Sequence, residues 1–338
     1  MKRILNLVFP LLFLSCNDGE LQIEALDFDA ASVEFCVTTS DDKLTNTFFF
    51  KIQGDEALLL TMGTGQFKNT TSLDGSITSN LTAGANPKLI YRLFTGTVNK
   101  GYFCDAIPAA EPGVVKENSA SGGVVTVTTS VSKVGKTNKT YTHNIAINDL
   151  SLTNESGERL TDTSTLDYGN FTTDTQNSAS LDVPFSNYTS INWLACGTPP
   201  AVGNTRLYKV LNDESITLDI PETLIANEAT GDVPRSALLE GTVRFKNTVF
   251  NALATQEFFC GTSLPEAIAA WDFVSDSGSI TVTTVENAPN AQGQLNYTHT
   301  LSLTDLVLVL QGNGDNVADI VLDAIPSVSL GTYTSIAP

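Results

Sequence analysis

The chain has 338 residues, with 18 Lys and Arg against 37 Asp and Glu, and its formal net charge is −19 at pH 7. This length predicts two domains, each large enough to bury a core. The acidic excess argues strongly against a nucleic-acid partner, because binding to phosphates requires clustered cations. Hydrophobic residues make up 41% of the chain, which is too many for a disordered acidic polypeptide.

The first fifteen residues have the features of an export signal. Lys2 and Arg3 precede an apolar stretch from Ile4 to Leu14, which is too short to span a bilayer and fits a secretory signal. The end of this stretch and the two residues after it read Phe13-Leu14-Ser15-Cys16. This sequence resembles a lipobox, with Phe13 in place of the usual leucine. The resemblance implies cleavage before Cys16 and lipid attached to Cys16. The alternative is an ordinary signal peptide followed by an incidental cysteine.

The predicted mature chain needs its lipid to reach a membrane. Residues 16–20 form a short acidic tether, and the loss of Lys2 and Arg3 makes the chain more acidic. Charge would therefore repel it from anionic headgroups. Acyl chains on Cys16 can hold it, because each buried methylene contributes about 0.8 kcal/mol. We expect a protein that is anchored to a membrane through Cys16 and does not cross it.

The remainder of the chain is an internal duplication. Residues 139–150 match residues 295–306 at an offset of 156, and Tyr102-Phe103-Cys104 matches Phe258-Phe259-Cys260 at the same offset. Such self-similarity indicates two copies of one structural unit. We expect one repeat over residues 21–174, a polar linker over 175–180 and a second repeat over 181–338.

The cysteines follow from this duplication. With Cys16 assigned to lipid, four cysteines remain, two in each repeat, and they allow three connectivities. The repeat favours Cys36–Cys104 and Cys196–Cys260, because each unit then closes its own bond. Such bonds persist in the oxidising surroundings of an exported protein. The alternative, a metal or redox centre, lacks both a Cys-x-x-Cys motif and neighbouring His ligands.

Period-two alternation predicts an all-β fold. In residues 141–147 and 297–304, apolar or aromatic residues alternate with small polar ones, which is typical of strands with one buried face. Two equivalent hairpins are predicted within residues 48–62 and 206–220. We expect two tandem β-sandwich domains, immunoglobulin-like or jelly-roll-like, with roughly eight strands and one disulfide in each.

One helix is predicted from Pro265 to Phe273. The corresponding segment of the first repeat contains Pro108 and Pro112. Proline interrupts helices, so we expect any helix there to be short and not shared by the two repeats.

His143 and His299 are the only histidines, and they stand at equivalent positions on the apolar side of predicted strands. A hydrogen-bonded structural role is the expected one, because two isolated histidines cannot form a metal site. The Asp55-Glu56 and Asp213-Glu214 pairs lie at predicted hairpin turns, where acidic residues are common. We expect no catalytic residue, no metal and no cofactor.

Trp193 and Trp271 are candidate platforms for stacking against a sugar ring. They align with Val33 and Val115 of the other repeat, which favours the alternative that both are core residues. The segment from Gly312 to Asn316, with Asp319 beyond it, is a candidate calcium loop. It lacks EF-hand spacing, and a polar hairpin turn is the favoured interpretation.

With its lipobox, the acidic residues after it, and its Thr- and Asn-rich β domains, the whole chain resembles duplicated β-domain lipoproteins of Bacteroidota. The resemblance implies the outer membrane, leaves open whether the protein faces the surface or the periplasm, and transfers no activity. Motifs of metalloproteases, serine hydrolases and nucleotide-binding proteins are missing from the sequence. We therefore expect a non-catalytic binding or assembly module of the envelope. The alternatives are a glycan-binding accessory protein of a polysaccharide-uptake system and a hydrolase that uses carboxylates.

Overall fold

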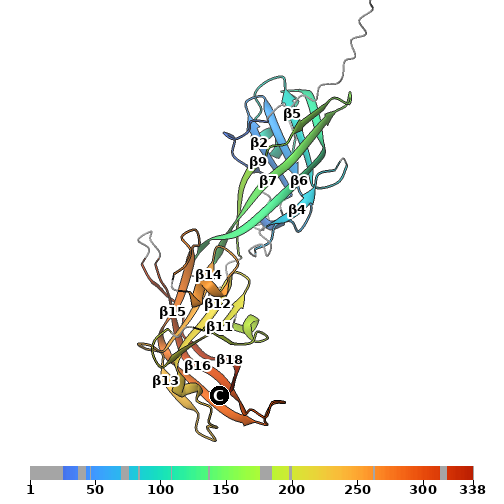
Figure 1. Ribbon diagram of the computed structural model, residues 1–338. Coiled ribbons are helices and arrows are strands. Elements are labelled where there is room, and N and C mark those ends of the chain that lie inside the picture. Colours follow the sequence, from blue (N-terminus) through green and yellow to red (C-terminus); the bar gives the residue numbers. More distant parts are fainter. Residues whose placement is uncertain are drawn as a thin grey trace, which may run out of the picture.

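The computed structural model describes residues 26–36, 43–45, 47–69, 76–82, 84–107, 109–135, 138–175, 185–197, 200–261, 263–312 and 318–337. These residues form an all-β molecule with two halves, each built on an antiparallel sheet and each closed by one disulfide (Figure 1). The predicted fold class is confirmed. Cys16, the predicted signal peptide and the tether lie outside the described residues.

The first half contains, in chain order, β1 (Glu34–Phe35), η1 (Lys43–Thr45), β2 (Phe48–Gln53), β3 (Glu56–Thr61), β4 (Ile77–Asn80), β5 (Lys88–Phe94), α1 (Lys100–Cys104), β6 (Val114–Val134), β7 (Lys139–Asn154), β8 (Arg159–Asp162) and β9 (Leu166–Asp174). The second half contains η2 (Phe185–Tyr188), β10 (Leu194–Ala195), β11 (Asn204–Leu211), β12 (Glu214–Pro221), η3 (Glu222–Ile225), β13 (Arg235–Leu238), β14 (Arg244–Phe250), α2 (Gln256–Cys260), β15 (Ala270–Asn287), β16 (Asn296–Leu310), β17 (Ile320–Val321) and β18 (Ile325–Ile336).

The two halves have the same topology. The first sheet runs β1-β2-β3-β5-β6-β7-β8, with β4 also paired to β6 and β9 also paired to β7. The second runs β10-β11-β12-β14-β15-β16-β17, with β13 on β15 and β18 on β16. Each sheet therefore has nine strands among the described residues, one more than we expected from the sequence. This identical pairing order supports a duplication of one unit.

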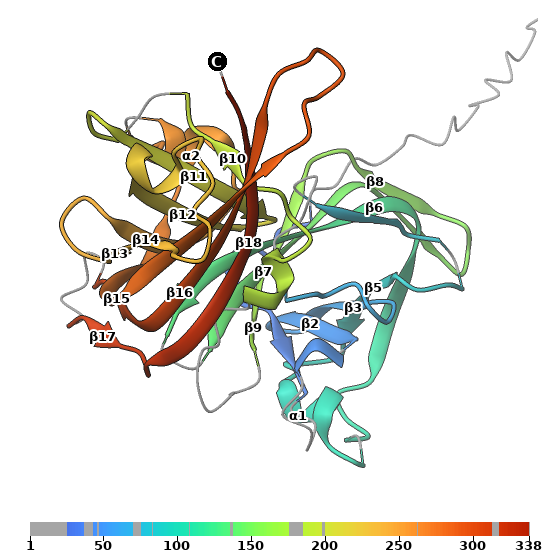
Figure 2. The same ribbon diagram turned by 90° about the horizontal axis from the view of Figure 1, so that it is seen from below.

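Each sheet folds back on itself where its longest strand bends. The first part of β6 pairs with β5 and its middle part pairs with β4, and the register shifts around Gly122 and Gly123 between them. Gly123 has a φ of +131°, and the equivalent Gly278 in β15 has a φ of +126°. Only glycine adopts this conformation readily. The bend moves β6 and β15 from one layer to the other, so that two layers face each other as in a sandwich. Figure 2 shows both halves as curved sheets.

The alternating side chains fill the space between the layers. Burial along β7 alternates almost residue by residue, as a strand with one covered face requires. In the first half, Phe49 and Leu58 of one layer share a core with Val127 and Ile145 of the other. The second half has the same arrangement.

The two predicted hairpins are confirmed. β2 pairs with β3 across a two-residue turn that contains Gly54, and β11 pairs with β12 across a turn that contains Asn212. Gly54 and Asn212 have φ values of +66° and +53°, the left-handed conformation that tight hairpins require and that Gly and Asn tolerate.

The predicted helix from Pro265 to Phe273 is wrong. β15 begins at Ala270, and both Trp271 and Phe273 are buried in the core. The short helices are instead α1 and α2, which occupy equivalent positions in the two halves and contain Cys104 and Cys260. The two halves therefore share a short helix, but it lies before the segment in which we expected one. Each spans only five residues, too few to show a helical period in the sequence.

The end of the β6–β7 hairpin connects the two halves of this elongated molecule (Figure 1). Val131, Val134 and Tyr141 of the first half belong to the same buried cluster as Leu218 and Trp271 of the second. Within the described residues, no helix is both long and apolar enough to cross a membrane.

Candidate functional site

The four cysteines form the two predicted disulfides. Cys36 is bonded to Cys104 with a Cα–Cα distance of 5.2 Å, and Cys196 to Cys260 with a distance of 5.5 Å. Each bond ties the segment at the first strand of a half to its short helix. The predicted connectivity is confirmed.

His143 in β7 is completely buried and hydrogen-bonded through both ring nitrogens. Nδ1 lies 2.8 Å from Oγ1 of Thr129, and Nε2 lies 2.9 Å from Oγ1 of Thr173. Thr173 donates its only hydroxyl proton to Oδ1 of Asn69, at 2.5 Å. His143 must therefore carry its proton on Nε2 and accept at Nδ1 from Thr129.

The second half repeats this network at equivalent positions. His299 in β16 is also fully buried, with Nδ1 2.9 Å from Oγ1 of Thr284 and Nε2 2.7 Å from Oγ of Ser335. Ser335 donates to Oδ1 of Asn227 at 2.5 Å, just as Thr173 does to Asn69. In each half, hydrogen bonds thus link a threonine to the histidine, the histidine to a second hydroxyl group, and that hydroxyl group to an asparagine.

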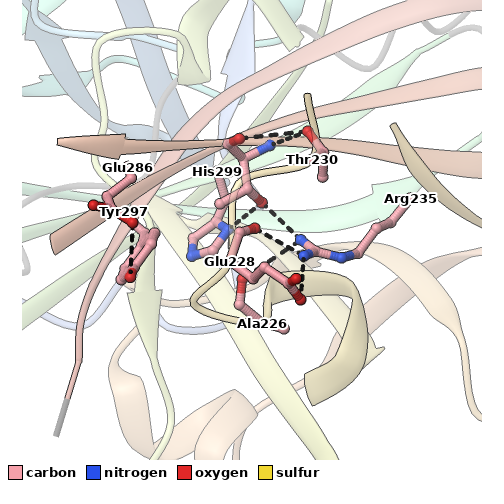
Figure 3. Close-up of polar contacts among 8 residues, drawn as sticks. Ala226, Glu228, Thr230, Arg235, Glu286, Tyr297 and His299 are labelled. Carbon is pink, nitrogen blue, oxygen red and sulfur yellow. Dashed lines mark hydrogen bonds and ion pairs between the residues drawn. The ribbon is translucent and has the colours of Figure 1, made fainter. Parts of the chain in front are cut away.

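The second copy has an additional arginine. Arg235 in β13 donates through Nη1 to Oγ1 of Thr284 at 3.0 Å and through Nη2 to the carbonyl of Glu228 at 2.8 Å (Figure 3). Ile77 takes the equivalent position in the first half, as the strand registers show. Because the Thr284 oxygen accepts from Arg235, its own proton is free to be donated to His299.

The contact between Ser335 and His299 has the spacing of a nucleophile and its base but the opposite proton direction. A serine nucleophile gives its proton to histidine, whereas Ser335 gives its proton to Asn227 and accepts from His299. The imidazole is also inaccessible. This arrangement stabilises the fold and does not activate a hydroxyl.

Burial keeps both imidazoles neutral. Desolvation lowers the pKa of His143 to about 4. Desolvation, followed by the nearby Arg235 charge, lowers the pKa of His299. Both are hydrogen-bonded core residues, as we expected.

The two tryptophans are also in the interior. Trp193 is 4% exposed, and its indole N–H donates to the carbonyl of Leu330 at 2.9 Å. Its ring lies over Lys209, with 5.0 Å from Nζ to the ring centroid. Trp271 is 8% exposed. Both side chains therefore have the burial that the core interpretation expects.

A cavity of about 590 Å³ lies between the two halves. Trp271, Leu310 and Ile320 of the second half line it together with Val134 and Asn138 of the first. Trp271 thus lines a concave surface.

The two acidic hairpin pairs have different surroundings. Asp55 is exposed at its turn, as ordinary turn acids are. Asp213 and Glu214 are buried where the halves meet, and Glu214 forms an ion pair with Lys139 of the first half. The sequence does not predict this role, because a partner on the other repeat leaves no local pattern.

Two buried lysines that we did not predict stand at equivalent positions, Lys51 in β2 and Lys209 in β11, and each is 2% exposed. The sequence around these lysines does contain a pattern that could have identified them. Each lysine interrupts an otherwise apolar strand, Phe-Phe-Phe-Lys-Ile in β2 and Leu-Tyr-Lys-Val in β11, and lysine is almost never fully buried without a partner.

In the part of the chain that the structure describes, no three His, Cys, Asp or Glu side chains gather to hold a metal ion. At the candidate calcium loop, the backbone N–H of Gly312 donates to Oδ1 of Asp319 at 2.9 Å. The intervening residues 313–317 lie outside the described ranges.

The chain matches no protein-family model, and it shows no significant similarity to a curated protein or to a solved structure.

Proposed function

We propose that this chain is a non-catalytic binding or assembly module of the bacterial envelope, anchored in the outer membrane by lipid on Cys16. The observation that carries the proposal is the junction of the halves. Val131, Val134 and Tyr141 extend into the core of the second half, and Lys139 pairs there with Glu214. A shared core holds two equivalent units in one arrangement, which suits a protein that presents surfaces to a partner.

The disulfides and the histidine networks support the same proposal. Disulfides persist outside the reducing cytoplasm, which agrees with the predicted export signal. His143 and His299 would be the first candidates for catalytic chemistry. Both ring nitrogens of each histidine are instead hydrogen-bonded to side chains of neighbouring strands. They are placed for stability.

The anchoring is tested by fractionating cells that produce the wild-type chain or Cys16→Ala. Loss of the acylated cysteine should move the protein from the membrane fraction to the soluble fraction. Wild-type protein found only in the soluble fraction, or a variant that stays with the membrane, would contradict the proposed anchor. Protease treatment of intact cells then separates a surface protein, which is digested, from a periplasmic one, which is protected.

The non-catalytic role is tested separately with purified protein and a set of hydrolase substrates. Turnover that disappears when a single carboxylate or histidine is replaced would favour the hydrolase alternative. Without such turnover the binding role stands.

A glycan-binding role is the second candidate, and one observation favours it. Beside Lys51 the first half has a hollow of about 390 Å³ that includes both carboxylate and hydroxyl groups. Pockets of a few hundred Å³ suit small ligands.

A further inference from the structure

The two buried lysines stand at the same strand position but have different neighbours. The β1–β2 register places Glu34 opposite Phe50, and the β10–β11 register places Leu194 opposite Tyr208. Lys51 and Lys209 follow directly after these strand residues. Because the two halves are duplicates, the surroundings of Lys51 can be compared directly with those of Lys209.

In the second half the site is closed. Lys209 Nζ donates to the carbonyls of Tyr188 and Leu330, both at 2.9 Å. The Trp193 ring covers the ammonium, and its indole N–H shares the Leu330 carbonyl. Two acceptors and a ring face satisfy a charge that would otherwise be costly to bury.

In the first half Lys51 borders a hollow, although its side chain is as deeply buried as that of Lys209. Val33 takes the place of Trp193, and the ring that would cover the ammonium is replaced by a short side chain. Lys51 Nζ has a single hydrogen bond among the described residues, a long one of 3.4 Å to the carbonyl of Asp167. A hollow of about 390 Å³ occupies this region, and its lining includes Asp29, Ser32, Val33, Lys51, Asp167 and Asn170.

The charges around the hollow restrict what it can hold. Asp167 and Asp29 are near enough to Lys51 to oppose the lowering of its pKa by burial. An anion that approaches Lys51 is repelled by two carboxylates, and a cation is repelled by the buried ammonium. A neutral ligand with several hydroxyls avoids both penalties, because each hydroxyl can donate to a carboxylate and accept from an ammonium.

We propose that the hollow beside Lys51 binds one ring of a neutral saccharide, while the equivalent site beside Lys209 is permanently closed by Trp193. The ring hydroxyls would accept from Lys51 and donate to Asp29 and Asp167, and Val33 would face the C–H surface of the ring. This inference rests on the proposed binding role and names its ligand class.

The test uses the full chain in detergent and saturation-transfer NMR with glucose, galactose, mannose and N-acetylglucosamine. At least one sugar should give a signal with the wild type. Val33→Trp installs the residue that closes the sister site, and it should weaken binding at least tenfold. Asp29→Asn, at an exposed position, should also weaken binding, and it keeps the test valid if Val33→Trp does not fold.

Lys51→Met and Lys209→Met form a matched pair. Each replaces a buried ammonium with an apolar side chain of similar length, but only Lys51 faces the hollow. Loss of the sugar signal in Lys51→Met and its retention in Lys209→Met would support the site.

Two results would overturn the inference. One is the lack of a signal from all four sugars with folded wild-type protein. The other is binding that is unchanged in both Asp29→Asn and Lys51→Met. In the first case, a signal from glycine that is lost in Lys51→Met would assign the hollow to a zwitterion. None of these results depends on where Cys16→Ala fractionates, so failure here is distinguishable from failure of the proposed anchor.

Discussion

Lys139 of the first half forms a buried ion pair with Glu214 of the second, with side-chain exposures of 13% and 10%. Desolvation lowers the pKa of Lys139, and the neighbouring Asp213 carboxylate opposes that shift. The pair therefore lies in a region where an unmatched charge would be costly. The ion pair joins two halves that have the same topology, and each half contributes one of its charges.

Removing one partner of this pair should destabilise the junction. Glu214→Gln removes the carboxylate that pairs with the buried Lys139 ammonium and leaves only the Asp213 carboxylate near it. We expect a loss of about 3–5 kcal/mol in the free energy of unfolding. Urea-induced unfolding measures the loss. The control is Glu117→Gln, which breaks the half-buried pair with Arg92 and should cost at most about 1 kcal/mol. Equal losses in the two variants would contradict a special role for Lys139 and Glu214.

Stability should fall in acid because of the histidines. The folded pKa of His143 is about 4, whereas an unfolded histidine has a pKa of about 6.5. Between these values the unfolded chain binds a proton that the folded chain does not. The stabilisation is therefore complete above pH 6.5 and is lost as the pH falls towards 4, at up to about 1.4 kcal/mol per pH unit.

The measurement is the free energy of unfolding in urea at several pH values from 4.5 to 7.5. His143→Gln cannot take up this proton, so its stability should depend less on pH than that of the wild type, even if it is lower throughout. An identical slope in both proteins would show that His143 contributes nothing to the acid sensitivity.

Because of its two disulfides, the oxidised chain should differ from the reduced chain in mass and in stability. The oxidised chain should be lighter than the reduced chain by about four hydrogens, as two S–S bonds require. The closed loops span sequence separations of 68 and 64 residues, so each bond should stabilise its half by about 4 kcal/mol on the chain-entropy model. Intact mass spectrometry and unfolding with and without reductant check both values. Free thiols at Cys36 or Cys196 in protein isolated from the envelope would contradict the assignment.

The strand bend should be intolerant of side chains. A Cβ atom added at Gly278 would lie 3.0 Å from the carbonyl oxygen of Thr304, and the φ of +126° disfavours L-residues. We expect Gly278→Ala to lower the free energy of unfolding by about 2–5 kcal/mol through strain and overpacking. Gly197→Ala is the control, because a Cβ there meets nothing within 4 Å. Thermal unfolding of both variants should separate them clearly.

Regular patterns in the sequence predicted the fold and the disulfides. Alternation around His143 and His299 places both on the buried face of a strand whatever the rest of the chain does, because the strand period is two. The pairing of Cys36 with Cys104 follows from the duplication. The short helices were not predictable, since a single turn is held by its surroundings and not by a helical pattern.

By itself the sequence determined the class of fold, the duplication and the cysteine pairing, because these depend on periodicity and on the order of residues along the chain. Only the tertiary structure decided which polar groups meet. Lys139 and Glu214 lie 75 positions apart, and no local rule relates them. The same holds for Lys51 and Val33: that a valine leaves the lysine beside a hollow, while Trp193 covers Lys209, depends on side-chain volume in three dimensions. Packing between distant segments carries this information, and a strand pattern does not.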